Sequence, residues 1–299
     1  MNQTTPADVA TQARSRARSI VVLALLTVYL VWGSTYLAIK VALESYPPFG
    51  MAAVRFAFAG AVLYGWLRLR GTPAPTALQW RNCAITGTLL LAGGNGLVCY
   101  AEMTVSSSLA AVAVASMPLF AAVFAGLYGK WPRRWDWVGL AIGFGGVLLL
   151  NLGGEMRASP AGALALLAAP LAWAFGSVWS KHQDMPGAWM STAAQMLAGS
   201  LALGVITLAL GEEFPDAPTA RATGALVYLA IFGSIAAFTA YVYLLNTVRP
   251  ALATSYAYVN PPVAVLLGVW LAGESFGAME AAAMAVILAG VAIILLQRR

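Results

Sequence analysis

The sequence predicts an all-α membrane protein of ten transmembrane helices, arranged as two inverted five-helix repeats around a central cavity. Three observations lead to this prediction: the composition, the spacing of the apolar segments and a faint internal repeat. Of the 299 residues, 61% are hydrophobic and only 9% are charged, and the mean hydropathy is +0.78. Soluble domains carry about 25% charged residues, so a chain of this composition is expected to lie in a lipid bilayer.

Apolar segments of about 20 residues, the length of a membrane-spanning helix, recur along the chain. We expect spans at residues 20–43, 49–68, 81–102, 106–129, 136–152, 160–181, 187–210, 222–247, 252–271 and 278–297. Residues 1–18 are predicted to be a polar cytoplasmic tail. The apolar segment after them is too long for the core of a signal peptide, and no small-residue cleavage site follows it, so we expect it to remain as the first span.

The basic residues test this number of spans independently. With the N-terminus in the cytoplasm, the predicted cytoplasmic segments hold 13 of the 17 Lys and Arg residues, whereas the outer segments hold only Arg157 and Arg221. Membrane proteins with short loops show this bias, and adding or removing one span would destroy it. The net charge of +6 comes from basic residues placed singly or in small groups between apolar runs, which argues against nucleic-acid binding.

Two segments about 143 residues apart resemble each other. The identities at this offset are Tyr100/Tyr243, Thr104/Thr247, Val105/Val248, Leu109/Leu252, Ala110/Ala253 and Pro118/Pro261. Because each repeat then has five spans, an odd number, the second copy must cross the membrane in the opposite direction. Inverted repeats are typical of secondary transporters, which bind substrate at the repeat interface. We place the first repeat at 19–152, a linker at 153–159 and the second repeat, with a short cytoplasmic C-terminus, at 160–299.

Each copy carries proline within an apolar segment, and three glycines interrupt the third span. Proline lacks an N–H and frees carbonyls of the preceding turn, which lipid tolerates only where they find a partner or line a wet cavity. The glycines weaken their helix, and the sequence leaves open whether they form a hinge beside the cavity or permit close helix packing. The gating or hinge candidates are Gly93, Gly94, Gly96, Pro118, Pro261 and Pro262.

Several motifs resemble one transporter family. Trp32-Gly33-Ser34 resembles the WGS-type motif of the drug/metabolite transporter superfamily, EamA family. The other motifs that resemble this family are Pro48 with Arg55-Phe56, the SLAAV…PLF run at 108–120 and Gly273-Glu274. The resemblance covers residues 20–297. It implies a ten-helix exporter of the bacterial inner membrane with both termini in the cytoplasm and a central cavity, which works by alternating access. The YddG-type amino-acid exporters are similar and imply export of aromatic and other neutral amino acids.

Aromatic side chains with few hydrogen-bonding groups gather on the interrupted helices. Such a wall suits a substrate with a flat, apolar side chain and a zwitterionic head. The substrate-binding candidates are Trp32, Tyr36, Asn95, Tyr100, Trp173, Ser177, Tyr241, Tyr256 and Asn260. For each single aromatic residue, packing within the bundle or at the membrane interface is the alternative.

Three charged residues are further candidates. Lys40 is expected near the outer end of its span, where it either snorkels to the interface, pairs with Glu102 or attracts a substrate carboxylate. Arg55 is expected about two turns inside its span, where a charge is costly and needs a partner, and we interpret it as stabilising the repeat interface. The spans have no central carboxylate, which disfavours a proton-coupled pump for cationic drugs and favours gradient-driven export.

Other function classes have less support from the sequence. With one histidine, His182, and no HExxH motif, Cys/His metal spacing or phosphate loop, we expect no enzyme activity, metal or cofactor. Export of quaternary amines, purines or sugars, a channel, and a transport-inactive sensor are the alternatives. The expected partners are a small-molecule substrate and the lipid bilayer, and a monomer is compatible with the sequence.

Overall fold

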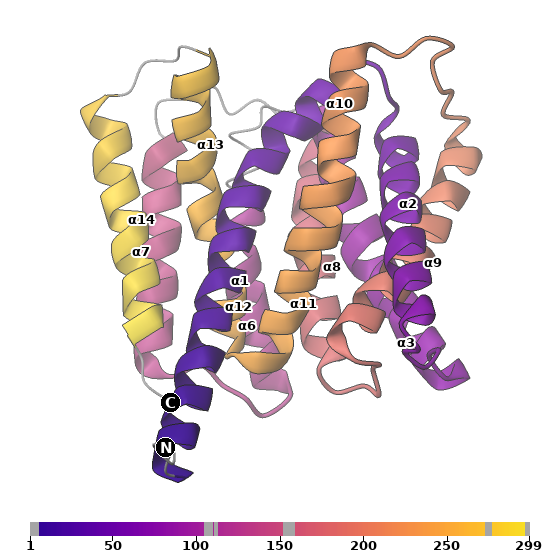
Figure 1. Ribbon diagram of the computed structural model, residues 1–299. Coiled ribbons are helices and arrows are strands. Elements are labelled where there is room, and N and C mark those ends of the chain that lie inside the picture. Colours follow the sequence, from indigo (N-terminus) through magenta and orange to yellow (C-terminus); the bar gives the residue numbers. More distant parts are fainter. Residues whose placement is uncertain (1–5, 105–109, 111–112, 152–158, 273–276, 297–299) are drawn as a thin grey trace.

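The computed structural model describes residues 6–104, 110, 113–151, 159–272 and 277–296, and every regular element within these ranges is a helix (Figure 1). The helices of the first half are α1 (Pro6–Ala42), α2 (Pro48–Leu69), α3 (Ala77–Gly87), η1 (Thr88–Gly96), α4 (Leu97–Glu102), α6 (Met117–Leu127) and α7 (Arg134–Asn151). Those of the second half are α8 (Pro160–Ser180), α9 (Ala188–Leu210), α10 (Ala220–Tyr228), η2 (Leu229–Ala236), α11 (Ala237–Thr247), α12 (Pro250–Ala253), α13 (Tyr256–Ala272) and α14 (Ala278–Leu296). The all-α prediction is confirmed.

Within the described ranges, six helices are long and apolar enough to cross a membrane. They are Arg18–Ala42, Pro48–Leu69, Ala77–Glu102, Pro160–Ser180, Ala188–Leu210 and Ala220–Thr247. These helices agree with the first, second, third, sixth, seventh and eighth predicted spans. Met117–Leu127 and Ala281–Ile294 are shorter apolar helices. The first helix begins at Pro6, so much of the predicted polar tail continues the first span as a helix.

The predicted span at 106–129 is divided before its proline. A turn at Ala115 and Ser116 precedes α6, and Pro118 lies in the first turn of that helix. Proline fits the first turn because its missing N–H would have no helical acceptor there. Pro118 therefore lies directly after an interruption of the predicted span, and its predicted role in gating stays untested.

The predicted span at 252–271 is divided in the same way. Thr254 and Ser255 form a turn between α12 and α13, and their hydroxyls donate to the carbonyls of Pro250 and Leu252 at 2.9 and 2.8 Å. Pro261 and Pro262 follow inside α13. Short polar side chains that bond to nearby backbone groups compete with regular helix, and this accounts for a break before the prolines.

The third helix of each repeat contains a π-helical segment at a corresponding place, η1 between α3 and α4 and η2 between α10 and α11. Each helix also begins with a threonine cap. Oγ1 of Thr76 accepts a hydrogen bond from the amide of Gln79 at 3.2 Å, and Oγ1 of Thr219 accepts one from the amide of Ala222 at 3.1 Å. Threonine at this position satisfies an amide that the first helical turn leaves free. The two caps are separated by the repeat offset found in the sequence.

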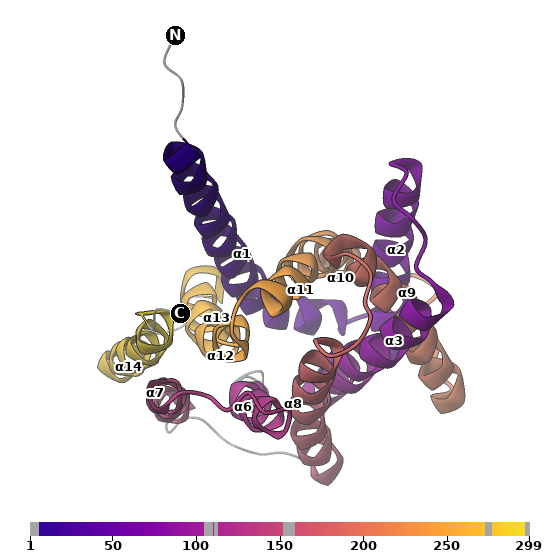
Figure 2. The ribbon, with the colours of Figure 1, turned by 90° about the horizontal axis from the view of Figure 1, so that it is seen from below.

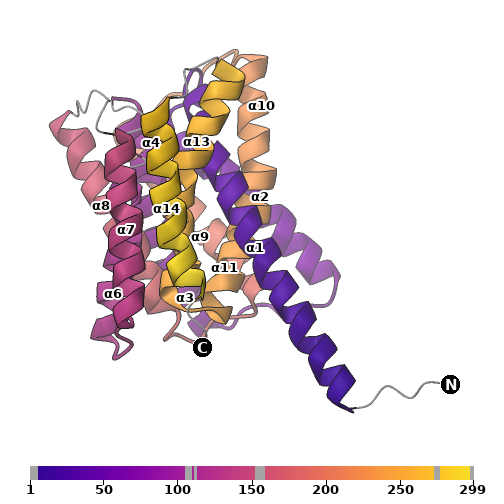
Figure 3. The same cartoon turned by 90° about the vertical axis from the view of Figure 1, so that its left-hand side faces the viewer.

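The helices of the two halves pack in matching pairs. At the two sides of the molecule α7 lies against α14 and α2 lies against α9, so each pair contains one helix from each repeat (Figures 1 and 3). Toward the centre, α1 contacts α11 and α13, while α8 contacts α4 and α6. Figure 2 shows α11, α13, α6 and α8 around the middle of the molecule. Each contact has a counterpart in the other half, as expected for an internal duplication.

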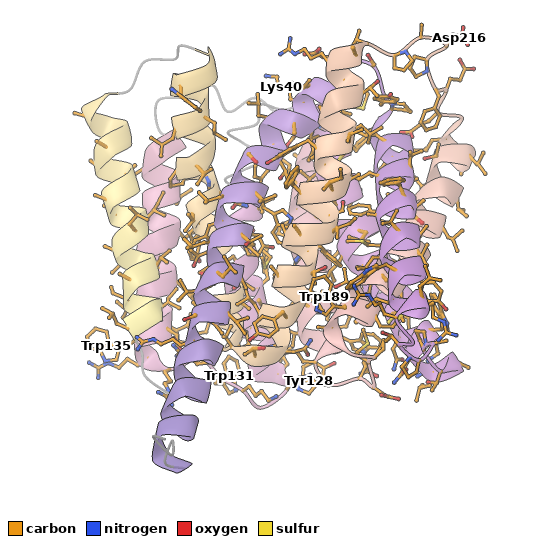
Figure 4. The ribbon with its side chains drawn as sticks, in the orientation of Figure 1. Lys40, Tyr128, Trp131, Trp135, Trp189 and Asp216 are labelled. Atoms are coloured by element: carbon orange, nitrogen blue, oxygen red, sulfur yellow. The ribbon has the colours of Figure 1, made fainter. Side chains whose placement is uncertain are left out.

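The two ends of the bundle differ in their side chains. The carboxylate of Glu212 accepts hydrogen bonds from the amides of Phe49 and Gly50, at 3.2 and 2.7 Å, where the positive end of the α2 dipole favours an anion. Lys40 lies toward this end, whereas Trp131 and Trp135 lie at the other end, where α1 begins and α14 ends (Figure 4). Both tryptophans are more than half exposed, as is typical of side chains at a membrane interface.

Candidate functional site

A cavity lies between the two halves, and the empty space in and at it, open solvent included, is about 650 Å³. Its wall is formed by side chains and backbone from α1, α2, η1, α4, α6, α8, η2, α11 and α13. The predicted substrate-binding residues that line it are Trp32, Tyr36, Asn95, Trp173, Tyr256 and Asn260. Two further candidates, Arg55 and Gly94, also line it. The fold therefore brings together side chains that the sequence places as much as 228 residues apart.

Three predicted substrate-binding residues do not line the cavity. The hydroxyl of Tyr241 lies 3.0 Å from Nε1 of Trp173, which donates to it, and 2.6 Å from Oγ of Ser177. Both residues are buried behind Trp173 and hold its indole ring in place. Tyr100 stacks on Phe49 with ring centroids 5.8 Å apart. Their expected contact with substrate does not agree with these positions, because all three pack between helices.

Aromatic rings close one end of the cavity. The ring centroid of Trp32 lies 5.5 Å from that of Trp173, 5.1 Å from that of Tyr241 and 4.6 Å from that of Tyr256. Edge-to-face and tilted pairs of this kind each contribute about 0.5–1.5 kcal/mol beyond their burial. Nε1 of Trp32 also donates to the carbonyl of Gly233 at 2.9 Å. This aromatic cluster joins both halves at the wall of the cavity.

The glycines of η1 permit close packing. A Cβ atom at Gly94 would lie 2.3 Å from Cε3 of Trp173, and Cβ atoms at Gly93 and Gly96 would lie within 2.9 and 2.8 Å of neighbouring side chains. No side chain fits these spaces without movement of the neighbours. The geometry favours the packing alternative that the sequence left open, and a hinge at these glycines stays a prediction.

Arg55 is buried in the wall of the cavity, with 3% of its surface exposed. Its Nε donates to Oγ of Ser234 in η2 at 2.8 Å, and its Cζ lies 4.4 Å from the centroid of the Phe56 ring. Its Nη1 is buried without a hydrogen-bond partner. Arg55 therefore joins α2 to the second half, as expected, but it also carries an unused donor group at the cavity.

The expected ion pair between Lys40 and Glu102 is absent from the described part of the chain. Both carboxylate oxygens of Glu102 are buried without a hydrogen-bond partner, and the side chain of Lys40 is exposed near the end of α1 (Figure 4). A long, flexible lysine gains more from solvation at the end of a span than from a partly buried pair. Lys40 therefore acts on Glu102 through its charge, without a direct contact, and their pairing stays a prediction.

Polar contacts close the end of the molecule where α14 ends. Nη1 of Arg249 lies 2.7 Å from Oδ1 of Asp136 at the start of α7, and its Nη2 donates to the carbonyl of Ile294 at 2.9 Å. Nearby, Nζ of Lys181 donates to the carbonyl of Val248 at 3.3 Å. Burial, together with the positive charge of Lys130, lowers the pKa of Lys181 to about 8. Sequence reasoning counted these basic residues as loop charges and missed their contacts.

Sequence reasoning also missed part of the cavity wall. Phe56, Met117, Pro170 and Phe238 line the cavity but were not among the candidates. Pro170 carried a signal, because it is a proline inside an apolar helix. Phe56 carried one as well, since it belongs to the Arg55-Phe56 motif. Met117 carried none, because lipid and protein interior are both apolar and do not determine which way an apolar side chain on an apolar helix points.

Known proteins resemble this chain over most of its length. The model of the EamA-like transporter family matches residues 19–152 and 160–296. The uncharacterized inner membrane transporter YedA of Escherichia coli is 46% identical over 274 residues, which cover 91% of this chain and 90% of the relative. A probable terminal-alkyne amino-acid exporter of Streptantibioticus cattleyicolor is 26% identical over 251 residues, which cover 83% and 84%. A crystal structure with 24% identity superimposes with a TM-score of 0.77 over 93% of this chain and 97% of the solved chain, and supports the fold.

Proposed function

The chain belongs to the EamA-like transporter family and is a membrane transporter, not an enzyme, and from this premise we propose that it exports neutral or aromatic amino acids from the cytoplasm. The proposal includes ten transmembrane helices in two inverted repeats, 19–152 and 160–299, joined by a linker at 153–159. It places both termini, with the tail at 1–18, in the cytoplasm of a bacterium and the spans in its inner membrane.

The observation that carries this proposal is the aromatic cavity between the two halves. A concave site with aromatic walls and a few convergent polar groups is typical of small-molecule binding. Rings of Trp32, Trp173 and Tyr256 offer flat apolar surface, while Asn95 and Asn260 offer amide groups. The similarity to a protein named as a probable amino-acid exporter supports the same substrate class.

The geometry supports transport by alternating access. The cavity extends to Val98, one helical turn before α4 ends at Glu102, at the end of the bundle that carries Lys40. On the other side of the cavity, the ring contacts of Trp32 with Trp173 and Tyr256 join the two halves. Loading from the cytoplasm then requires these contacts to separate while the Lys40 end closes, which the matching helix pairs of the two halves permit.

Efflux from reconstituted vesicles tests the export proposal. Vesicles loaded with labelled phenylalanine should release it faster than vesicles without protein. Truncation of a buried aromatic contact typically costs 2 kcal/mol or more, so Trp173→Ala and Tyr256→Ala should each slow efflux by about 30-fold. Trp270→Ala, on the same helix as Tyr256 but 82% exposed, is the matched control. Equal efflux by all three variants and the wild type would contradict the proposed site.

Reporter fusions test the proposed membrane arrangement separately. Fusions to the N-terminus and to the C-terminus should both report a cytoplasmic location, because an even number of spans returns the chain to its starting side. Reporters on opposite sides of the membrane would exclude the arrangement of two five-helix inverted repeats.

A further inference from the structure

We propose that Arg55 binds the carboxylate of the transported substrate, so that the cavity selects amphipathic carboxylates with a flat apolar body over organic cations. This inference rests on the proposed export function and names the chemical class that the cavity takes. Its basis is a buried guanidinium group that lines the cavity and has hydrogen-bond donors left unused.

The guanidinium group of Arg55 is fixed on one side only. Its Nε donates to Oγ of Ser234 at 2.8 Å, and that hydroxyl donates in turn to the carbonyl of Leu229 at 3.1 Å within η2. A guanidinium has five N–H donors, and neither Nη1 nor Nη2 has a hydrogen-bond partner among the described residues. The contact with Ser234 therefore orients the group and leaves the fork of terminal nitrogens, which binds carboxylates in bidentate fashion, available.

No protein carboxylate compensates this charge in the part of the chain that the structure describes. The ion pairs there join Arg221 with Glu44 and Arg249 with Asp136, and the cavity wall contains no Asp or Glu. A buried cation without a counter-charge costs free energy. A ligand carboxylate would supply the missing charge while it is bound, which turns this cost into a source of binding affinity.

The rest of the wall fits the remainder of such a ligand. Phe56, Trp32 and Tyr256 offer ring surface for an apolar body. Oδ1 of Asn260 is a buried acceptor without a hydrogen-bond partner, so an N–H group of the ligand, such as an ammonium, has an acceptor in the same cavity. A ligand with a positive charge alone would bring a second cation near Arg55, which is unfavourable in a medium of low dielectric constant.

A purely structural role for Arg55 predicts a different result. If Arg55 only joins α2 to η2 through Ser234, its replacement changes stability but leaves the preference among ligands of one shape unchanged. Three compounds with the same phenethyl body separate these roles. Phenylalanine carries a carboxylate and an ammonium, 3-phenylpropanoate carries only the carboxylate, and phenethylamine carries only the ammonium.

Equilibrium binding of the three labelled compounds to the full-length protein in lipid nanodiscs is the test. We expect the wild type to bind both carboxylates at least about 10-fold more tightly than phenethylamine. Loss of a charged hydrogen-bond donor should weaken carboxylate binding by about 10- to 100-fold in Arg55→Gln and abolish the preference. Arg55→Lys keeps the charge but lacks the fork, so it should be intermediate. Arg68→Gln removes the same charge from an exposed position of the same helix and should bind like the wild type.

Several outcomes would overturn the inference. They are unchanged carboxylate affinity in Arg55→Gln, a wild-type preference for phenethylamine, and no wild-type binding of either carboxylate. Should Arg55→Gln fail to fold, the same comparison is made with Arg55→Lys, where an affinity equal to that of the wild type overturns it.

Efflux of the same compounds separates this inference from the export proposal. Binding that depends on Arg55, without efflux from vesicles, supports the carboxylate site and contradicts export. Efflux of phenylalanine at the wild-type rate in Arg55→Gln keeps export and overturns the carboxylate site.

Discussion

The segments η1 and η2 occupy corresponding places in the two halves but do different things there. Each lies against the first and second helices of the other half, η1 against α8 and α9, and η2 against α1 and α2. In η1 the contact depends on glycine, which has no side chain, and Gly94 packs directly on the ring of Trp173. In η2 it depends on polar groups, since the carbonyl of Gly233 accepts from Trp32 and Ser234 accepts from Arg55.

This difference shows that the two copies of a duplicated scaffold contribute different groups to one site. Where backbone packs on backbone, as between Gly87 and Gln195, the helices are held close and no space remains. Where a long side chain such as Arg55 separates the helices, its unused donors border the cavity. We therefore expect changes at the closely packed glycines on the η1 side to act mainly on stability, and changes at Ser234 in η2 to act on ligand binding as well.

The largest effect is expected from adding a methyl group on the η1 side. A Cβ atom at Gly87 would lie 2.3 Å from the carbonyl oxygen of Gln195, and a backbone atom cannot move aside easily. Overpacking of this kind should make Gly87→Ala less stable by about 3 kcal/mol. Thermal unfolding of the purified protein measures it. Gly204→Ala on α9, where no atom lies within 4 Å of the added Cβ, is the control and should be neutral or gain up to about 1 kcal/mol. Equal stability of the two variants would show that the close contact between Gly87 and Gln195 does not limit the stability of the protein.

The next effect concerns a polar contact that lies outside the cavity. Asp136→Asn removes the carboxylate charge that lies 2.7 Å from Nη1 of Arg249, whose side chain is 25% exposed, and should lower stability by about 2 kcal/mol. The double variant Asp136→Asn with Arg249→Gln should lose less stability than Asp136→Asn alone. Glu44→Gln breaks an exposed pair with Arg221 at 3.8 Å and should change stability by less than about 1 kcal/mol. Asp136 and Arg249 do not line the cavity, so Asp136→Asn should leave the preference for carboxylates over phenethylamine unchanged. A changed preference would show that this contact affects ligand binding as well as stability.

On the η2 side a smaller loss of stability should accompany a change in binding. Ser234→Ala leaves the buried Nε of Arg55 without an acceptor, which should cost about 1–2 kcal/mol and weaken carboxylate binding because the guanidinium is no longer oriented. Ser200→Ala removes a hydroxyl of α9 that bonds only within its own helix and is expected to change stability by less than about 0.5 kcal/mol. Binding of 3-phenylpropanoate to both variants tells them apart. Wild-type affinity in Ser234→Ala would show that the contact does not position Arg55.

The smallest effect is a pH dependence at the closed end of the molecule. Burial lowers the pKa of Lys181 to about 8 from 10.5, so between these values the unfolded chain binds more protons than the folded one. Stability should therefore rise with pH in this interval, by about 1 kcal/mol at pH 9 relative to pH 7. Lys181→Met should lack this increment when unfolding is followed at both pH values. An identical pH dependence in the variant would assign the effect to other groups.

Composition and spacing predicted the all-α class and the six long apolar helices, because hydropathy over about 20 residues depends only on the local sequence. The offset between Tyr100 and Tyr243 likewise indicated the duplication that the paired helix contacts support. The helices break before Pro118 and Pro261, at short polar residues whose hydroxyls bond to the backbone.

The sequence by itself therefore determined the membrane class, the two related halves and most of the aromatic side chains that meet at the centre. Only the tertiary structure decided that Trp32 and Tyr256 line the cavity while Tyr241 is buried outside its wall. It also decided that Arg55 donates to Ser234 while its Nη1 has no hydrogen-bond partner. The physical reason is that lipid and protein interior are equally apolar. A helix that is hydrophobic on every side carries no pattern that says which face turns inward, so the packing of its neighbours makes that choice.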